Sequence, residues 1–158
     1  MMDISTILLC SLITISTFLF MEFVAWFTHK YVMHGFLWVW HKSHHKVHDH
    51  TLERNDLFAL VFSIPSFCLI YYSTGIEQLP YVTAIGIGIL CYGIFYFIFH
   101  DILVHQRIKW RPKKKTNYLN RMIHAHYIHH LKRTKEGCEA FGFLYAPKKF
   151  EEKKMTEK

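Results

Sequence analysis

Three long apolar segments constrain the fold more than any other feature of this sequence. They are Ile4–Phe27, which contains one charged residue, Glu22, and Leu57–Thr74 and Tyr81–Phe99, which contain none. As helices rising 1.5 Å per residue, each would span roughly 27–36 Å, about the thickness of a bilayer's hydrocarbon core. A soluble domain of 158 residues has too little polar surface to cover three such helices. We therefore predict an all-α integral membrane protein.

The first apolar segment must also be compared with a cleaved secretory signal peptide. No Lys or Arg precedes Lys30, so the basic region that starts such a peptide is missing. The apolar run is also too long, and no small-residue cleavage site follows it. We expect it to be retained as a transmembrane helix.

The basic residues predict the topology of these helices. Four Lys or Arg residues lie in 29–56 and the other 15 in 100–158, with none in 1–28 or 57–99. With three crossings, both basic regions fall on one side, which the positive-inside rule makes cytoplasmic, and the N-terminus lies outside. A fourth, partial crossing near residues 35–40, "GFLWVW", stays open. We favour an interfacial segment there because Trp prefers the headgroup level.

The histidines collect on the same predicted face. All 13 lie in 29–50 or 100–130. The hairpin formed by the second and third apolar segments returns the chain to the face that it left, so these two regions come together. We therefore predict three to four transmembrane helices that carry a cytoplasmic, helical, histidine-rich cap.

Ten of the histidines form one spacing pattern that occurs twice, HxxxxH followed by HxxHH. The ten are His29, His34, His41, His44, His45, His100, His105, His126, His129 and His130. On a helix, HxxHH places three imidazoles on one face, where two metal ions can share them. In HxxxxH, about 140° separates the two side chains, so each α-helix must bend or end at that pair.

The number of motif histidines indicates the kind of metal site. Ten are too many for one zinc ion, which takes four ligands. They suit two six-coordinate ions with about two positions open for water, O₂ or a bridging group. Imidazole binds Fe, Cu, Ni and Zn alike, so residue type alone does not select the metal.

Three acidic residues are candidates to support these histidines. Glu22 lies two helical turns before His29, on the same face, and either accepts a proton from a ligand's other ring nitrogen or is hydrogen-bonded within the bundle. Asp56 and Asp101 either orient a ligand histidine or cap and solvate helix ends, and we favour the second reading.

Residues outside the four motifs carry weaker signals. We expect surface or supporting roles for His48, His50 and His124 rather than metal ligation. The apolar segment 139–146 either folds back over the metal site or lies at the membrane interface. Gly86, Gly88 and Gly93 in the third apolar segment either allow close helix contact, which we favour, or leave room for a long ligand.

The sequence around the histidines resembles that of a known family. The order of motifs is similar to that of the fatty acid hydroxylase superfamily, the non-haem di-iron membrane oxygenases. The strings "HKYVMHGFLWVWHKSHH", "NDLFALVF", "HDILVHQR" and "EGCEAFGFLYAP" are similar to bacterial β-carotene 3-hydroxylases from about residue 22 to 147. The resemblance implies that the ten motif histidines bind two iron ions. It also implies O₂-dependent hydroxylation of β-ionone rings at C3, from β-carotene through β-cryptoxanthin to zeaxanthin.

The resemblance also implies a cellular setting. It implies a bacterial inner membrane, a carotenoid substrate drawn from the bilayer lipid and no nucleic-acid partner. Because the sequence shows no flavin, haem or iron–sulfur motif, a ferredoxin-type protein is expected to supply electrons to the basic face, although lipid contact explains those charges equally well. We expect a single membrane-embedded domain over residues 1–147 and a charged, flexible tail over 148–158.

Alternative functions remain open from the sequence. Another di-iron membrane oxygenase, such as a carotenoid ketolase or a sterol or fatty acid hydroxylase, predicts the same metals and topology. A non-catalytic metal-binding membrane protein predicts histidines along a path through the membrane. The collection of the histidines on one face argues against that last reading.

Overall fold

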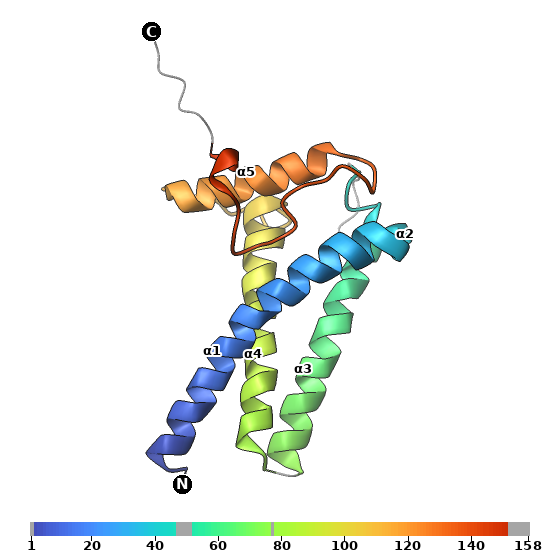
Figure 1. Cartoon of the computed structure of the whole chain (residues 1–158). Coiled ribbons are helices and arrows are strands. Elements are labelled where there is room, and N and C mark those ends of the chain that lie inside the picture. Colours follow the sequence, from blue (N-terminus) through green and yellow to red (C-terminus); the bar gives the residue numbers. More distant parts are fainter. Residues whose placement is uncertain (1, 47–51, 77, 152–158) are drawn as a thin grey trace.

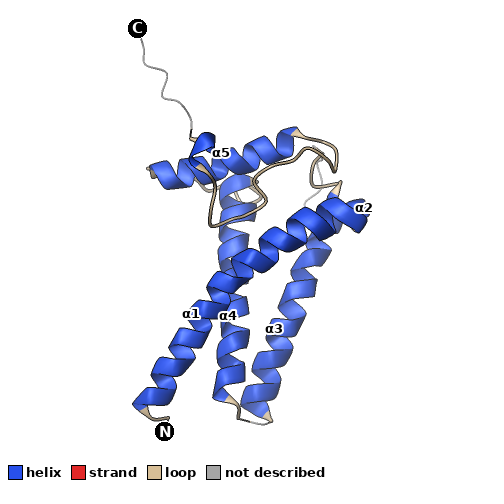
Figure 2. Ribbon diagram, viewed as in Figure 1, coloured by secondary structure: helices blue, strands red, loops and turns tan. Residues whose placement is uncertain are grey.

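The predicted membrane helices are present in the computed structural model of the chain, which describes residues 2–46, 52–76 and 78–151 (Figure 1). The described part is all-helical, with no strand (Figure 2). Its helices provide three candidate membrane spans, at Ile4–Phe36, Arg54–Gly75 and Pro80–Val104. The chain is therefore an integral membrane protein with an all-α fold. The described residues contain no fourth candidate span, because residues 35–40 only lead from the first span into a four-residue helix, α2 (Trp38–His41).

The first span consists of two helix types in succession. Helix α1 covers Ile4–Phe27, and the Asp3 side chain caps its start by accepting a hydrogen bond from the Thr6 amide at 2.7 Å. The helix continues as a π-helical segment, η1, over Thr28–Phe36. Within η1, Gly35 leaves the helical region (φ −102°, ψ −122°), and the chain turns there toward α2.

The other two spans form an antiparallel hairpin. A short 3₁₀ segment, η2 (Arg54–Asp56), leads into α3 (Leu57–Gly75). Helix α4 covers Pro80–Tyr96, with the proline in its first turn where no amide hydrogen is needed, and continues as the π-helical η3 (Phe97–Val104). Because both hairpin helices are almost entirely apolar, they suit lipid on the outside of the bundle and each other on the inside.

Helix α4 is the central helix and contacts both α1 and α3. Two glycines allow these close contacts. A Cβ atom at Gly86 would lie 2.7 Å from Ile70 Cγ1 of α3, and one at Gly88 would lie 2.6 Å from Thr17 Cβ of α1. The reading of these two glycines as close-contact positions is therefore correct.

A cap covers one end of the bundle, opposite the N-terminus and the α3–α4 turn (Figure 1). Its main element is α5 (Asn117–Leu131), which lies across the ends of the spans and starts at Thr116, whose hydroxyl accepts from the Leu119 amide. Residues 139–146 fold back beneath α5, and Phe143 packs in a buried cluster with Phe99 and Met122. Of the two positions predicted for this segment, the structure shows the one that folds back over the histidines, because the Phe141 carbonyl accepts a hydrogen bond from His29 Nδ1 at 3.0 Å.

The start of the expected tail belongs to this packed cap. Lys148–Phe150 form a 3₁₀ turn, η4, and Phe150 is buried in the same apolar cluster as Met122. The expectation of a flexible tail from residue 148 therefore does not hold for residues 148–150, because an aromatic ring at 150 has apolar surface to bury. The rest of that tail, 152–158, lies outside the described residues, as do His48 and His50.

Candidate metal centre

The two HxxxxH pairs lie where the membrane helices change from α to π winding. His29 and His34 are both in η1, and His100 is in η3 with His105 directly after it. The His105 amide donates to the His100 carbonyl at 2.9 Å, an i to i+5 hydrogen bond. Such a bond closes one turn of a π-helix, so residues i and i+5 lie above one another. A local change of helix type, together with the bend at Gly35, thus aligns pairs that a straight α-helix would separate.

The two HxxHH motifs lie in the cap. His41 ends α2, and His44 and His45 follow in the adjoining turn. His126, His129 and His130 lie on α5. Figure 1 shows that α5 and the α2 region approach each other across the ends of the spans, so all four motifs meet there.

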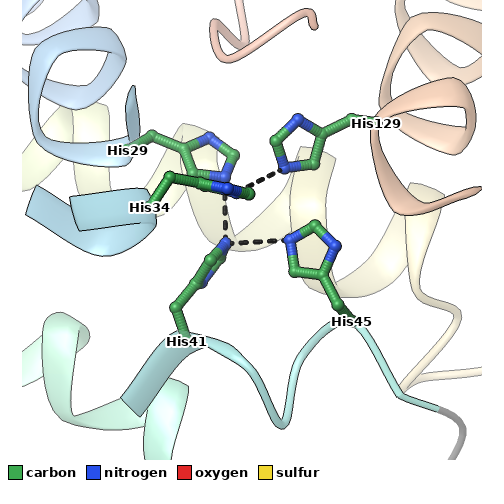
Figure 3. A group of neighbouring side chains, drawn as sticks. All are labelled: His29, His34, His41, His45 and His129. Atoms are coloured by element: carbon green, nitrogen blue, oxygen red, sulfur yellow. Dashed lines mark hydrogen bonds between the residues drawn. The ribbon is translucent and has the colours of Figure 1, made fainter. Parts of the chain in front are cut away.

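The ten motif histidines divide into two groups of five, in each of which the candidate ligand atoms lie within 4.8 Å of one another. The first cluster is His29, His34, His41, His45 and His129 (Figure 3). The second cluster is His44, His100, His105, His126 and His130. Each HxxHH motif is divided between the clusters: its first and last histidines lie in one cluster and its middle histidine lies in the other.

The ring nitrogens of the first cluster have two distinct environments. Every Nδ1 atom donates a hydrogen bond outward to an oxygen, at 2.7–3.0 Å. The acceptors are the carbonyls of Phe141, Lys135, Lys132 and Glu139 and the side-chain oxygen of Asn55, serving His29, His34, His45, His129 and His41 in that order. The Nε2 atoms point inward, toward one another (Figure 3).

This arrangement fits a bound cation. A neutral imidazole carries one N–H and one lone pair, so Nδ1 donation leaves five Nε2 lone pairs facing each other. His41 Nε2 lies 3.2 Å from His29 Nε2 and 3.1 Å from His45 Nε2, which is unfavourable for lone pairs alone. With metal–nitrogen bonds of about 2.1 Å, neighbouring nitrogens around a six-coordinate ion are about 3.0 Å apart. The cluster therefore has the spacing and the electron pairs that a metal ion requires.

Burial keeps these imidazoles in the neutral form that metals bind. It lowers the pKa of His41 to about 2, that of His129 to about 3 and that of His45 to about 4. In the second cluster, burial and, to a smaller extent, repulsion from neighbouring imidazoles hold the pKa values of His44 and His126 well below their usual range. Protons therefore compete weakly with a metal at neutral pH.

The second cluster has the same inward geometry with different outward partners. The Nε2 atoms of His44 and His100 are 2.9 Å apart, as are those of His126 and His130. His44 Nδ1 donates to the Glu53 carboxylate at 3.0 Å. Glu53 also binds the Arg107 guanidinium, which comes from the chain just after the second HxxxxH pair.

A cavity of about 690 Å³ lies between α1, α3 and α4 and leads to the two clusters. Its wall includes His29 and His41 of the first cluster and His100 of the second. Along α3 it extends from Phe58 to Thr74, about 24 Å at 1.5 Å per residue, which is most of a hydrocarbon core. The cavity therefore has the length and position to hold an elongated apolar molecule that enters from the bilayer.

The polar groups on this wall are largely bound to the protein itself. The Ser66 hydroxyl donates to the Gly86 carbonyl at 2.8 Å, and the Tyr92 hydroxyl donates to Glu22 at 2.7 Å. The remaining surface is mostly aromatic and aliphatic, and includes Phe62. Such a wall favours a ligand without charges.

Comparison with known proteins identifies the family. Residues 14–147 match the fatty acid hydroxylase family. The chain belongs to the fatty acid hydroxylase family. It is 49% identical over 138 residues to the "Beta-carotene hydroxylase" of Pantoea ananas, covering 87% of this chain and 77% of that protein. No solved structure matches the chain.

Other relatives of this chain include bacterial and plant proteins. It is 44% identical over 137 residues to the "Beta-carotene hydroxylase" of Paracoccus sp. (strain PC1), covering 86% of this chain and 83% of that protein. It is 35% identical over 136 residues to the "Beta-carotene 3-hydroxylase 2, chloroplastic" of Arabidopsis thaliana, covering 84% of this chain and 44% of that one.

Glu22 of this family member does not contact a cluster histidine, contrary to one of its two predicted roles. Its Oε1 accepts hydrogen bonds from the Phe143 and Leu144 amides at 2.8 and 2.9 Å, and its Oε2 accepts from Tyr92. The Phe143 ring lies parallel to the His29 ring, with centroids 5.7 Å apart. Glu22 therefore holds the returning segment against the first cluster, as the predicted bundle-bonded alternative required.

The two aspartates occupy different positions in the hydroxylase. Asp101 Oδ1 lies 3.5 Å from His100 Nδ1 and 3.2 Å from Arg107 Nε. Its role, whether it orients that imidazole or caps the helix end, stays a prediction. Asp56 accepts from the Glu53 amide at 2.9 Å, the capping role that we favoured, and from Arg107 at 2.8 Å.

Three functional positions were missed from the sequence. Asn55 and Glu53 bind His41 and His44, and Arg107 ties Glu53 to Asp56 and Asp101. The polar run 53–56 before an apolar helix is ambiguous, because the same residues form a helix cap. His124 belongs to neither cluster, and its Nδ1 donates to the Phe150 carbonyl at 2.8 Å.

Proposed function

We propose that this chain is a β-carotene 3-hydroxylase. It uses O₂ to hydroxylate C3 of the β-ionone rings, converting β-carotene to β-cryptoxanthin and then to zeaxanthin. The observation that carries this proposal is the apolar cavity that opens between the membrane helices and ends at both histidine clusters. The names of bacterial and plant relatives support the substrate and, for the plant proteins, the position hydroxylated.

Two non-haem iron ions are the metals that we propose for the clusters. Each cluster offers five imidazoles, which leaves one position of a six-coordinate ion for O₂ or water. When bound, the irons supply the redox chemistry that activates O₂ and oxidises the C–H bond. The demand for redox chemistry favours iron over zinc, which has none.

The protein contributes the positioning of the substrate and the exclusion of water to this reaction. In a β-ionone ring the C4 hydrogens are allylic and more weakly bound than those at C3, so an unselective oxidant attacks C4. Hydroxylation at C3 therefore requires walls that hold C3 closer to the metals. Phe143, Tyr96 and Met33 line the cluster end of the cavity and are placed to restrict the ring.

The outward partners of the histidines contribute rigidity. The carbonyls of Lys132 and Lys135 and the side chain of Asn55 fix ring orientation and tautomer before any metal binds. The returning segment, anchored by Glu22, also covers the first cluster and keeps water from it.

The cap is proposed to face the cytoplasm of a bacterial cell, with the N-terminus outside the inner membrane. The support is the positive-inside rule, because the mostly exposed segment 108–115, which contains five Lys or Arg residues, lies at the cap end. An acidic ferredoxin-type protein is the proposed electron donor for this face, since charge complementarity favours its docking. The same charges also suit anionic lipid. A single catalytic domain over residues 1–147 is part of this proposal.

Pigment analysis tests the function directly. The chain is expressed in a bacterium that accumulates β-carotene, and the extracted carotenoids are separated by liquid chromatography. We expect β-cryptoxanthin and zeaxanthin. Canthaxanthin would instead identify a ketolase, and unchanged β-carotene alongside folded, iron-loaded protein would refute the hydroxylase.

A further inference from the structure

The outward partners of the first cluster are all uncharged. Its five Nδ1 atoms donate to four backbone carbonyls and to the amide oxygen of Asn55. A neutral acceptor orients the imidazole but adds little to its electron-donating strength. A metal in this cluster is therefore held by ordinary neutral imidazoles.

Two histidines of the second cluster face carboxylates instead. Glu53 Oε1 lies 3.0 Å from His44 Nδ1, and the side chains of this pair are only 5% and 1% exposed. Asp101 Oδ1 lies 3.5 Å from His100 Nδ1, with side-chain exposures of 12% and 3%. Because both pairs are buried, their electrostatic effect is weakly screened by water and salt.

Arg107 gathers these carboxylates into one group. Its Nε lies 3.2 Å from Asp101 Oδ1 and its Nη1 lies 2.8 Å from Asp56 Oδ1, while its Nη2 binds Glu53. Three carboxylates share one guanidinium, so the group keeps a formal negative charge beside the second cluster. The guanidinium also fixes the carboxylate that accepts from His44 and the one that lies beside His100.

This asymmetry has a consequence for bound iron. An imidazole that donates to a carboxylate is a stronger base and gives more electron density to its metal. A nearby negative charge also stabilises the more positive oxidation state. We propose that the second cluster holds the iron with the lower reduction potential, and that Glu53 and Asp101, held by Arg107, are the positioning residues that lower it.

The inference rests on the proposed di-iron content and defines an order of electron loss. When one electron passes from the fully reduced protein to an added oxidant, Fe(II) in the second cluster becomes Fe(III). The iron in the first cluster stays Fe(II) until a second electron is removed. Two separate steps are therefore expected in a redox titration.

Two near-isosteric substitutions test the assignment, one by removing a charge beside the second cluster and the other by adding a charge beside the first. Glu53→Gln keeps an oxygen that accepts from His44 but removes the charge, and Asn55→Asp adds a charge opposite His41. The purified, iron-loaded protein in detergent is titrated anaerobically with ferricyanide and dithionite. Electron paramagnetic resonance follows the mixed-valence state, and iron content is measured for every variant.

We expect both substitutions to decrease the difference in midpoint potential between the two oxidation steps. Glu53→Gln raises the lower potential, whereas Asn55→Asp lowers the upper one. If the first cluster were oxidised first, both substitutions would increase the difference instead. A wild-type protein that titrates in one step, or variants with unchanged steps, would also overturn the inference.

A matched control separates charge near the imidazoles from charge elsewhere in the cap. Glu151 lies in the cap, and its carboxylate accepts a hydrogen bond from Arg121 at 2.6 Å rather than from an imidazole. Glu151→Gln removes this carboxylate without changing an imidazole partner, and we expect neither step to move. Asp101→Asn provides an independent second variant and should act in the same direction as Glu53→Gln.

This titration contains no carotenoid, so its result is separate from the pigment assay. Zeaxanthin production with an increased difference in midpoint potential would overturn the redox assignment alone. A difference that decreases as expected, with no zeaxanthin formed, would overturn the hydroxylase proposal alone. Folded protein that binds no iron would overturn both.

Discussion

Glu22 and Phe143 are 121 positions apart in the sequence, yet the Glu22 carboxylate accepts a hydrogen bond from the Phe143 amide at 2.8 Å. The carboxylate sits within an apolar helix, where a charge without partners is costly. Three donors compensate for that cost, namely two backbone amides and the Tyr92 hydroxyl. The contact joins α1 and α4 to the segment that covers the first cluster.

Removing this carboxylate should release the returning segment. We expect Glu22→Ala to lower iron content and hydroxylation severalfold and to expose residues 139–146 to limited proteolysis. Glu22→Gln should retain more of each, because its amide oxygen can still accept from the two backbone groups. Equal behaviour of the two variants would contradict an anchoring role.

Gly142 offers a test of the same contact without altering the carboxylate. A Cβ atom at Gly142 would lie 2.6 Å from Glu22 Oε1, closer than such atoms can approach. Gly142→Ala should therefore reproduce part of the Glu22→Ala phenotype. Gly137→Ala is a less suitable control, since Gly137 has a φ of 77°, in the left-handed region that favours glycine.

Loss of one cluster histidine should be distinguishable from loss of a histidine outside the clusters. His45→Ala removes one of five imidazoles from the first cluster and leaves the second complete. We expect fewer than two iron ions per chain and no zeaxanthin, with the protein still in the membrane. His124→Ala should keep two irons and most activity, because His124 contacts Phe150 instead. Metal analysis of both membrane-extracted variants decides between these outcomes.

Much of the architecture could be predicted from local patterns. Spans of uniformly apolar residues have few alternatives to membrane helices, and the positions of the histidines at their ends place all ten in one region. The repeated spacing also predicted two metal sites. These features depend on residue type and distance along the chain, both of which the sequence shows directly.

The assignment of each histidine to a cluster could not be predicted in the same way. His44 and His45 are neighbours in sequence but belong to different clusters, and α5 is divided similarly between His129 and His130. That division depends on how the turn after α2 and helix α5 face each other across the ends of the spans, which the spacing of the histidines along the chain does not show. The partner of Glu22 likewise depends on a contact formed only after the chain has folded back.

Close packing at Gly88 should make this position intolerant of side chains. An added Cβ would lie 2.6 Å from Thr17 Cβ and 2.8 Å from the Thr14 carbonyl, so α1 and α4 would have to separate. We expect Gly88→Ala to destabilise the protein by about 1–3 kcal/mol, the usual range for overpacking. Thermal unfolding in detergent measures this loss, and an unchanged midpoint would show that the helices adjust freely.

The low pKa values in the first cluster predict how the stability of the metal-free protein depends on pH. An unfolded histidine has a pKa near 6.5, whereas that of folded His45 is about 4 and that of folded His129 about 3. The unfolded chain thus binds more protons as pH falls from about 6.5 toward 4. The contribution of these two histidines to the free energy of unfolding of the metal-free protein should therefore be complete above pH 6.5 and should fall as the pH drops below it.

The clusters should retain bound iron to a lower pH than an exposed histidine site does. In the folded protein, protons compete for His45 Nε2 only near pH 4. We expect full iron content after desalting at pH 5.5 and release at pH 3.5. Loss of half of the iron between pH 7 and 6 would contradict the buried, neutral state of these imidazoles.

Gly93 should control how deeply a substrate enters the cavity. It lines the cavity on α4, two helical turns before His100, and a Cβ atom there would meet nothing within 4 Å. Side chains at this position can therefore grow into the cavity without disturbing α1 or α3. We expect Gly93→Ala, Gly93→Val and Gly93→Phe to fold and bind iron equally well.

Their activities should nevertheless decline with side-chain size, because each step removes space beside the route to the clusters. We expect Gly93→Phe to lower kcat/KM for β-carotene at least tenfold, about 1.4 kcal/mol of transition-state stabilisation. Gly93→Ala should remain near the wild-type value, which separates it from Gly88→Ala on the same helix. Zeaxanthin formation by Gly93→Phe at the wild-type rate would show that the substrate reaches the metals by another path.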